Sequence, residues 1–108
     1  MENLITIAVD AMGGDNSPTK IIDGIELHSK KSKNIFYKIF GDRNIINPII
    51  ERKKLNENVV EIIHTEEKVK GEDSAFAAAK RGKNTSMWLA IESVKNKSSD
   101  IVISAGNT

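Results

Sequence analysis

The sequence predicts an α/β fold built on a parallel sheet, because apolar strands alternate with helical segments along the chain. The first and last strands read as continuous apolar runs, which are typical of strands covered on both faces. Strands are expected at 4–10, 35–40, 59–64 and 100–104. Helices are expected at 18–31, about 44–54, about 73–81 and 85–96. We expect one domain over 1–108 with no internal boundary.

The helices are predicted from capping residues and apolar spacing. Ser17 suits the N-cap of the first helix and Pro18 its first helical position. Pro48 must lie in the first turn of the second helix or break it. The last helix, capped by Asn84 or Thr85, repeats apolar residues at helical spacing. Its predicted buried face consists of Met87, Ala90, Ile91 and Val94.

Composition excludes several classes of protein. The 108 residues include 16 basic and 15 acidic residues, so no net charge points to nucleic acid or an acidic membrane surface. There is no cysteine, hence no disulfide or thiolate metal site, and no apolar stretch approaches the length of a membrane span. These features favour a cytoplasmic protein, and we expect no cofactor.

The loop Asp10–Asp15 follows a buried strand and precedes a helix, and it contains Gly13 and Gly14 between its two carboxylates. Glycines allow close backbone approach, and free N–H groups at a helix start favour an anion such as phosphate. Either the loop binds phosphate, or its carboxylates hold a lysine or arginine side chain, or Asp10 caps nearby backbone while the glycines only make the turn. It matches neither a dinucleotide fingerprint nor a P-loop.

Three further segments carry candidate groups. Arg81 and Lys83 precede a helix whose start offers Ser86, which forms either an anion cradle or an ordinary helix end. The last strand runs into Ser104, Gly106, Asn107 and Thr108, which form a ligand loop or a plain turn. His64 ends another strand as an acid–base group or a structural side chain. Since ligands of open α/β sheets lie at the carboxyl ends of strands, we expect Gly13 and Gly106 on one shared rim.

Together these segments resemble the bacterial phosphate acyltransferases of phospholipid synthesis. Ile7–Asp15 (IAVDAMGGD) is similar to the opening segment of that family, and Asp100–Thr108 (DIVISAGNT) to its fourth strand and loop. Gly41-Asp42, Ile63-His64 and the Asn84–Met87 helix start match in type and spacing. The resemblance covers the whole chain, which would be the N-terminal part of a longer acyltransferase.

The resemblance implies a three-layer α/β/α fold, a homodimer, no metal and peripheral membrane association of the complete protein. It implies transfer of an acyl group from acyl-acyl-carrier-protein to inorganic phosphate, giving acyl-phosphate. Asp10, Asp15 and, more weakly, His64 would be catalytic. Phosphate and substrate would be bound by Gly13, Gly14, Arg81, Lys83, Ser86, Ser104, Gly106, Asn107 and Thr108.

The chain departs from the family in three respects. Lys80–Lys83 (KRGK) is less basic than the usual Arg-Arg-Lys-Lys stretch, Ala75 replaces a usual proline, and family members are much longer. Catalysis is therefore expected to need the remaining C-terminal part, as a continuous or a complementary chain. The alternative is a truncated, non-catalytic module that binds an anion or a partner. An uncovered edge at 100–104 would favour association.

Overall fold

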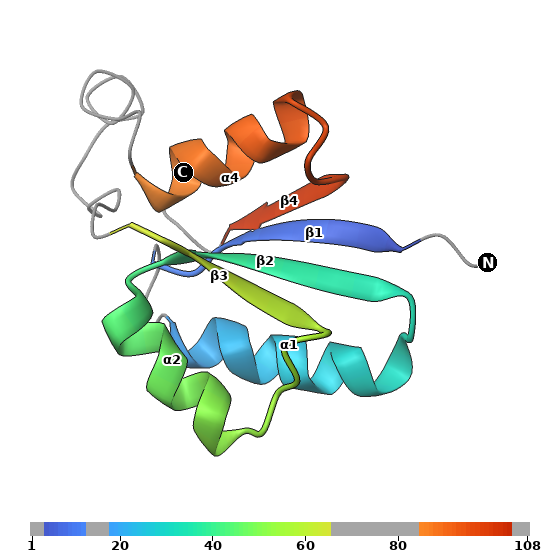
Figure 1. The fold of residues 1–108 in the computed structure, drawn as a ribbon, viewed down its shortest axis with the longest axis vertical. Helices are drawn as coiled ribbons and strands as arrows, with labels where there is room; N and C mark the ends of the chain where they lie inside the picture. The colour runs from blue at the N-terminus through green and yellow to red at the C-terminus, as the bar shows by residue number, and fades with distance from the viewer. Residues whose placement is uncertain (1–3, 13–17, 66–84, 105–108) are drawn as a thin grey trace.

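The computed structural model describes residues 4–12, 18–65 and 85–104, in which four strands form one parallel sheet with helices on both faces (Figure 1). In chain order the elements are β1 (Ile5–Asp10), α1 (Thr19–Lys31), β2 (Ile35–Gly41), α2 (Arg43–Arg52), β3 (Val60–His64), α4 (Ser86–Lys95) and β4 (Ile101–Ser104). The predicted α/β class is confirmed. The helix expected at about 73–81 lies outside the described residues.

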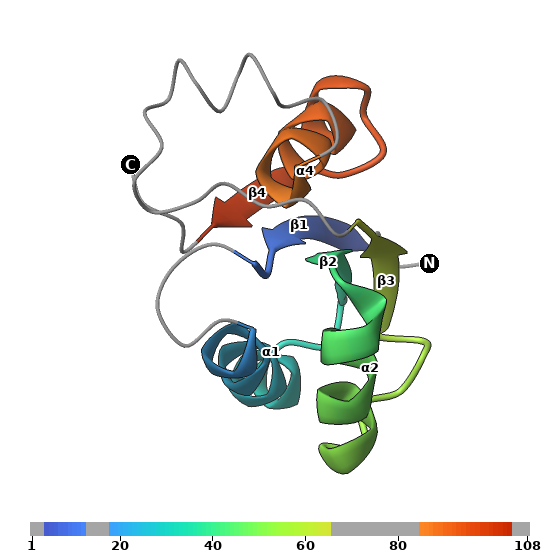
Figure 2. The same cartoon turned by 90° about the vertical axis from the view of Figure 1, so that its left-hand side faces the viewer.

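The sheet has the strand order β3-β2-β1-β4, so the chain steps from β1 to β2 to β3 and then returns to the other side of β1. Right-handed crossovers that run in opposite directions place their helices on opposite faces of a sheet. Figure 2 shows this arrangement, with α1 and α2 on one face and α4 on the other. The described elements therefore form three layers.

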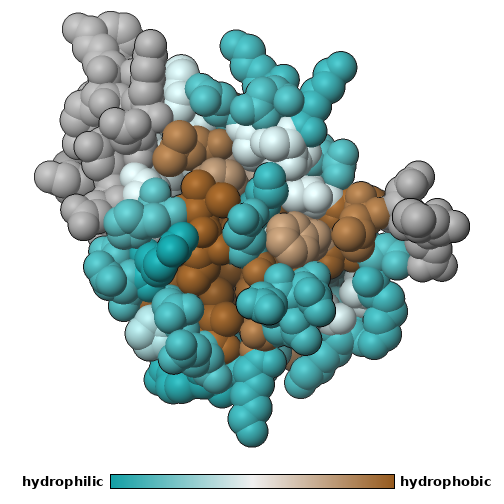
Figure 3. Space-filling view, in the orientation of Figure 1, coloured by the Kyte–Doolittle hydropathy of each residue, from teal (hydrophilic) through white to brown (hydrophobic). Residues whose placement is uncertain are grey.

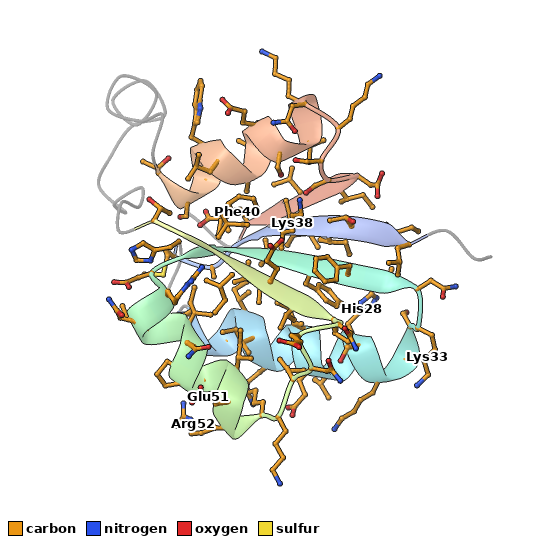
Figure 4. The ribbon with its side chains drawn as sticks, viewed as in Figure 1. His28, Lys33, Lys38, Phe40, Glu51 and Arg52 are labelled. Atoms are coloured by element: carbon orange, nitrogen blue, oxygen red, sulfur yellow. The ribbon has the colours of Figure 1, made fainter. Side chains whose placement is uncertain are left out.

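Each face of the sheet has its own apolar core. The larger core joins β1, β2 and β3 to α1 and α2 and consists of Ile7, Val9, Ala11, Met12, Ile22, Ile25, Tyr37, Ile39, Ile46, Ile49, Ile50 and Val60. The smaller core, beneath α4, is built on Ala8, Phe40 and Ala90. Figure 4 shows Phe40 between the sheet and α4, and His28 of α1 on the opposite side of β2. Alternate residues of β1 and β2 thus serve both layers.

Polar contacts tie α1 to its neighbours in the larger layer. Lys53, just after α2, forms ion pairs with Asp23 and Glu26 of α1. The hydrogen bond to Asp23 is the main reason that the pKa of the Lys53 amino group lies above its ordinary value. His28 Nδ1 is hydrogen-bonded to the hydroxyl of Tyr37, a buried residue of β2. Burial raises the pKa of that phenol.

The positions of the two prolines in the first two helices differ from the prediction. Pro18 occupies the N-cap position and α1 begins at Thr19, so the expectation that Pro18 is the first helical residue is wrong by one position. Ser17 lies outside the described residues. Pro48 lies inside α2, beyond its first turn, yet the helix continues to Arg52. The loss of one helical hydrogen bond is offset by the buried face of α2, which consists of Ile46, Ile49 and Ile50.

The buried face of α4 is rotated from the predicted one. Thr85 is the N-cap, as one of the two predicted options, but the buried residues are Ser86, Ala90 and Ser93. Ile91 is exposed, because small polar side chains, which an apolar count ignores, face the sheet instead. Ser93 donates a hydrogen bond to the Ala90 carbonyl oxygen, and its oxygen accepts one from the Ser99 hydroxyl, so its burial leaves no polar group unsatisfied.

Strand β4 is the largest departure from expectation. Its apolar residues Ile101, Val102 and Ile103 predict a strand covered on both faces, whereas all four residues of β4 are exposed. The strand pairs with β1 on one side and forms an edge of the sheet in the described part of the chain. The apolar residues do form a strand. Among the described residues, however, no helix covers the side of β4 that faces the α1 layer, and no further strand pairs with β4.

Candidate functional site

The reversal of strand order places a topological switch point between β1 and β4. From β1 the chain leaves toward β2 over one face, and it reaches β4 from the opposite face through α4. Connections diverge at such a point and leave a crevice beyond the carboxyl ends of the strands, where open α/β sheets bind their ligands. The last residue of β1, Asp10, pairs in register with Ser104, the last residue of β4.

Asp10 lies at this switch point, at the end of β1. Its side chain is almost fully buried, with 1% of the residue exposed. Oδ1 accepts hydrogen bonds from the Met12 backbone N–H at 3.2 Å and from the Ser86 hydroxyl at 2.5 Å, and Oδ2 accepts one from the Ser104 hydroxyl at 2.7 Å. Among the described residues, no lysine or arginine forms an ion pair with it. Within the described ranges, three hydrogen-bond donors therefore stabilise the carboxylate.

The start of α4 is fixed in the same place. Thr85 caps the helix by accepting a hydrogen bond from the Trp88 backbone N–H at 3.1 Å, and Ser86, the first helical residue, is fully buried against Asp10. A helix start carries backbone N–H groups that no helical carbonyl satisfies and a partial positive charge. The capping hydroxyl and the carboxylate of Asp10 together place this positive end at the switch point.

His64 lies at the same edge of the sheet but in a separate position. It ends β3, two strands away from β1, which at the usual spacing of strands is roughly 10 Å. Its Nδ1 accepts a hydrogen bond from the Arg43 backbone N–H at 3.0 Å, and the Arg43 guanidinium binds the Ile62 carbonyl oxygen at 2.9 Å. A ring whose Nδ1 accepts carries its proton on Nε2 when neutral. His64 thus braces the start of α2.

The structure brings together three of the predicted site residues, Asp10, Ser86 and Ser104, from parts of the chain up to 94 positions apart. It does not join His64 to them. The remaining predicted site residues lie outside the described part of the chain: Gly13, Gly14, Asp15, Arg81, Lys83, Gly106, Asn107 and Thr108. The expected proximity of Gly13 and Gly106 stays a prediction, and the contact between Asp10 and Ser104 is consistent with it.

The contact between Arg43 and His64 was not predicted from sequence. The role of Arg43 in holding His64 could have been found from its position, since the first residue of a helix that follows a strand presents its N–H at the carboxyl edge. The Met12 contact with Asp10 is the local backbone cap weighed for that residue, and the two serines join it. Asp10 therefore both caps its own loop and contacts two other elements, α4 and β4.

The described surface also contains a groove away from Asp10. It runs between α2 and β3, where Figure 3 shows apolar side chains gathered, and Phe36, Ile50, Leu55 and Ile62 form part of its lining. None of the predicted site residues lines it. Within the described ranges, no helix has the length and hydropathy needed to cross a membrane, and no group of three or more potential metal ligands is present.

Comparison with known proteins identifies the family of this chain. The sequence model of a family described as "Fatty acid synthesis protein" matches residues 5–108. The chain belongs to this family. All the segments that carry the resemblance to phosphate acyltransferases fall within the matched range.

Individual relatives of the chain are named phosphate acyltransferase. The chain is 64% identical over 108 residues to a phosphate acyltransferase of Pelagibacter ubique, covering 100% of this chain and 32% of that protein. It is 43% identical over 105 residues to the phosphate acyltransferase of Parvibaculum lavamentivorans and 44% identical over 102 residues to that of Streptococcus uberis. These matches cover 96% and 94% of this chain and 29% of each relative. The chain thus spans about a third of the length of these relatives.

Proposed function

We propose that the polypeptide containing this chain transfers an acyl group from acyl-acyl-carrier-protein to inorganic phosphate, forming acyl-phosphate. The observation that carries the proposal is the meeting of β1, β4 and the start of α4 at Asp10, within segments that match the phosphate acyltransferases. The relatives are named for this activity, and the switch point is where an α/β sheet would bind a small anion.

The proposed role of this chain is to hold phosphate. The start of α4 would contribute its positive end, and the three neighbouring loops would contribute backbone N–H groups and cations. The side chains and backbone proposed for this task belong to Gly13, Gly14, Arg81, Lys83, Gly106, Asn107 and Thr108. Held there, a phosphate oxygen would attack the thioester carbonyl carbon, and collapse of the tetrahedral intermediate would release the carrier thiolate.

The acyl side of the reaction would come from polypeptide beyond this chain. We propose that residues 1–108 are one part of a single α/β domain, and that the complementary part or a second subunit covers β4. The exposed apolar residues of β4 support this, because an unpaired apolar edge strand favours association. The complete protein would then act on acyl-acyl-carrier-protein in the cytoplasm.

The direct test compares the purified 108-residue chain with the complete polypeptide that its gene encodes. Acyl-phosphate formation is measured from acyl-acyl-carrier-protein and inorganic phosphate. We expect turnover only from the complete polypeptide. Turnover by the 108 residues alone would contradict the division of roles, and a complete polypeptide that binds phosphate without turnover would favour a non-catalytic anion-binding module.

A site test uses Asp15→Ala in the complete polypeptide. We expect kcat/KM to fall about 10²-fold or more, since Asp15 is proposed to be catalytic and a positioned general base contributes at least this much. Asp42→Ala is the matched control, because Asp42 caps α2 at the same edge by accepting a hydrogen bond from the Asn44 N–H at 2.9 Å. The control should lose about 1 kcal/mol of stability and keep its activity. Equal activities for the two variants would make the Asp15 loop structural.

A further inference from the structure

We propose that Asp10 is a positioning residue: its carboxylate clamps the first residue of α4 to the last residue of β4 and so sets the geometry of the phosphate site. This inference rests on the proposed function and assigns Asp10 a role other than proton transfer. It follows from how the carboxylate and the two serine hydroxyls are used.

The carboxylate has little capacity left for a substrate. A carboxylate offers about four lone-pair positions, and Met12, Ser86 and Ser104 occupy three of them. A general base must come within hydrogen-bond reach of the proton that it takes. With 1% of its surface exposed, Asp10 does not meet that requirement in this arrangement. Its position instead suits a fixed acceptor for groups of the protein itself.

The two serine hydroxyls are committed to the clamp. A hydroxyl has one hydrogen to donate, and those of Ser86 and Ser104 are donated to Asp10. Phosphate oxygens need donors, so while the clamp is closed these hydroxyls offer phosphate only lone pairs. The expectation that both serines bind phosphate through their side chains is therefore revised. Their function in this proposal is to fix the start of α4 and the end of β4 to Asp10.

The clamp joins elements that are far apart in the sequence. Asp10 lies on a central strand, Ser86 begins the helix of the α4 layer, and Ser104 ends the exposed edge strand. At the other end of the same strand pair, Asp100 forms a second connection: its Oδ2 accepts from the Thr6 N–H at 2.8 Å. The two carboxylates thus hold β1 to β4 at opposite ends, and only Asp10 also holds α4.

This symmetry supplies a matched control for the experiment, made in the complete polypeptide. Asp10→Asn removes the carboxylate but keeps one acceptor oxygen, and Asp100→Asn makes the same change at the far end. For a positioning role, we expect Asp10→Asn to raise the KM for phosphate about 10-fold to 100-fold, as a small misplacement would. Its kcat should stay within about 10-fold of wild type with the pH profile of kcat unchanged. Asp100→Asn should leave both constants unchanged.

Two kinetic results would overturn the clamp. A fall in kcat of about 10²-fold to 10⁴-fold with loss of the acid limb of the pH profile would make Asp10 a general base. Losses of stability in Asp10→Asn and Asp100→Asn with no change in the KM for phosphate would make Asp10 a purely structural residue. In the first case the group touches substrate, and in the second it has no influence on the site.

A second measurement tests the clamp without relying on activity. Asp10→Ala should accelerate amide hydrogen exchange at Ser86, Met87 and Trp88, and adding Ser86→Ala and Ser104→Ala should accelerate it little further, because the three residues act as one unit. Additive changes would contradict the clamp. If the wild-type polypeptide forms no acyl-phosphate, the proposed function fails, and the exchange data still decide whether Asp10 fixes the start of α4.

Discussion

One row of residues across the sheet shows how differently its two sides are covered. Val60, Tyr37, Ile7 and Ile101 are register partners on β3, β2, β1 and β4. The first three are 6%, 3% and 7% exposed, and Ile101 is 49% exposed. Ile7 and Ile101 have the same side chain on neighbouring strands, but α1 and α2 cover only the strands up to β1. Burial here depends on the layer above the strand.

The carboxyl ends of β1 and β4 present the opposite case. Although β4 is exposed along its length, its last residue, Ser104, donates a hydrogen bond to the buried Asp10 of β1. The edge strand is therefore weakly covered but firmly placed where the candidate site lies. Polar contacts at the strand ends therefore fix the position of β4 where apolar coverage by the described elements does not.

The largest expected effect is the difference in stability loss between substitutions of Ile7 and Ile101. In the 108-residue chain, Ile7→Ala should cost about 3 kcal/mol, since it leaves a cavity in a covered core. Ile101→Ala should cost less than about 1 kcal/mol, because its side chain is half exposed. Urea unfolding measures both. Equal losses in this chain would contradict the difference in coverage, and a larger Ile101→Ala loss in the complete polypeptide would show that β4 becomes covered.

The next effect concerns the other neighbour of β1. A Cβ added at Gly41 would lie 2.6 Å from Ile46 Cδ1 and 2.7 Å from Met12 Cγ, so the end of β2 depends on the absence of a side chain. Gly41→Ala should destabilise the chain by about 1–3 kcal/mol through overpacking. Gly24→Ala is the control: nothing lies within 4 Å of its added Cβ in helix α1, and a gain of about 0.5–1 kcal/mol is expected. A neutral Gly41→Ala would show that the end of β2 can relax.

A smaller effect is expected at the start of α4, the helix that packs against β1 and β4. Thr85→Ala removes the side chain that accepts from the Trp88 N–H at the start of α4 and should cost about 1 kcal/mol. Thr85→Ser keeps the capping oxygen and should retain most of that stability. Thermal unfolding of the two variants measures the difference. If serine fails to restore stability, the threonine methyl group, and not the cap, fixes the helix start.

The smallest expected effect is the pH dependence of stability that comes from Tyr37, a covered member of the residue row. The pKa of Tyr37 is raised by burial, so the folded state holds the phenol proton more tightly than the unfolded chain. Stability is then kept below the unfolded pKa and lost as pH rises through the folded one. Between about pH 8 and about pH 11, the free energy of unfolding should fall less steeply with pH for Tyr37→Phe than for the unsubstituted chain. The raised pKa of Lys53 acts in the same direction, so part of the slope remains. Identical slopes would contradict the effect of burial.

Local sequence was sufficient for much of the fold. The four strands, the parallel arrangement and the start of α4 after Thr85 follow from apolar runs, alternation and capping chemistry. Sequence failed where tertiary contacts outweigh local preference. Pro48 is tolerated because its helix is held by a buried face. Ile91 is exposed because Ser86 and Ser93 are buried in its place, and their hydroxyls donate to Asp10 and to the Ala90 carbonyl oxygen.

The candidate site shows the same division. Loop position predicted Asp10, Ser86 and Ser104 as members of one site, because parallel strands end at a common edge. Sequence could not tell that both serines donate to Asp10 or that His64 instead accepts from Arg43, since those choices depend on atoms brought together across the sheet. The chain by itself determined which segments become strands, helices and polar strand ends, since these depend on neighbouring residues. Only the tertiary structure decided which apolar strand is covered and which polar groups pair, since burial and hydrogen bonding require partners distant in sequence.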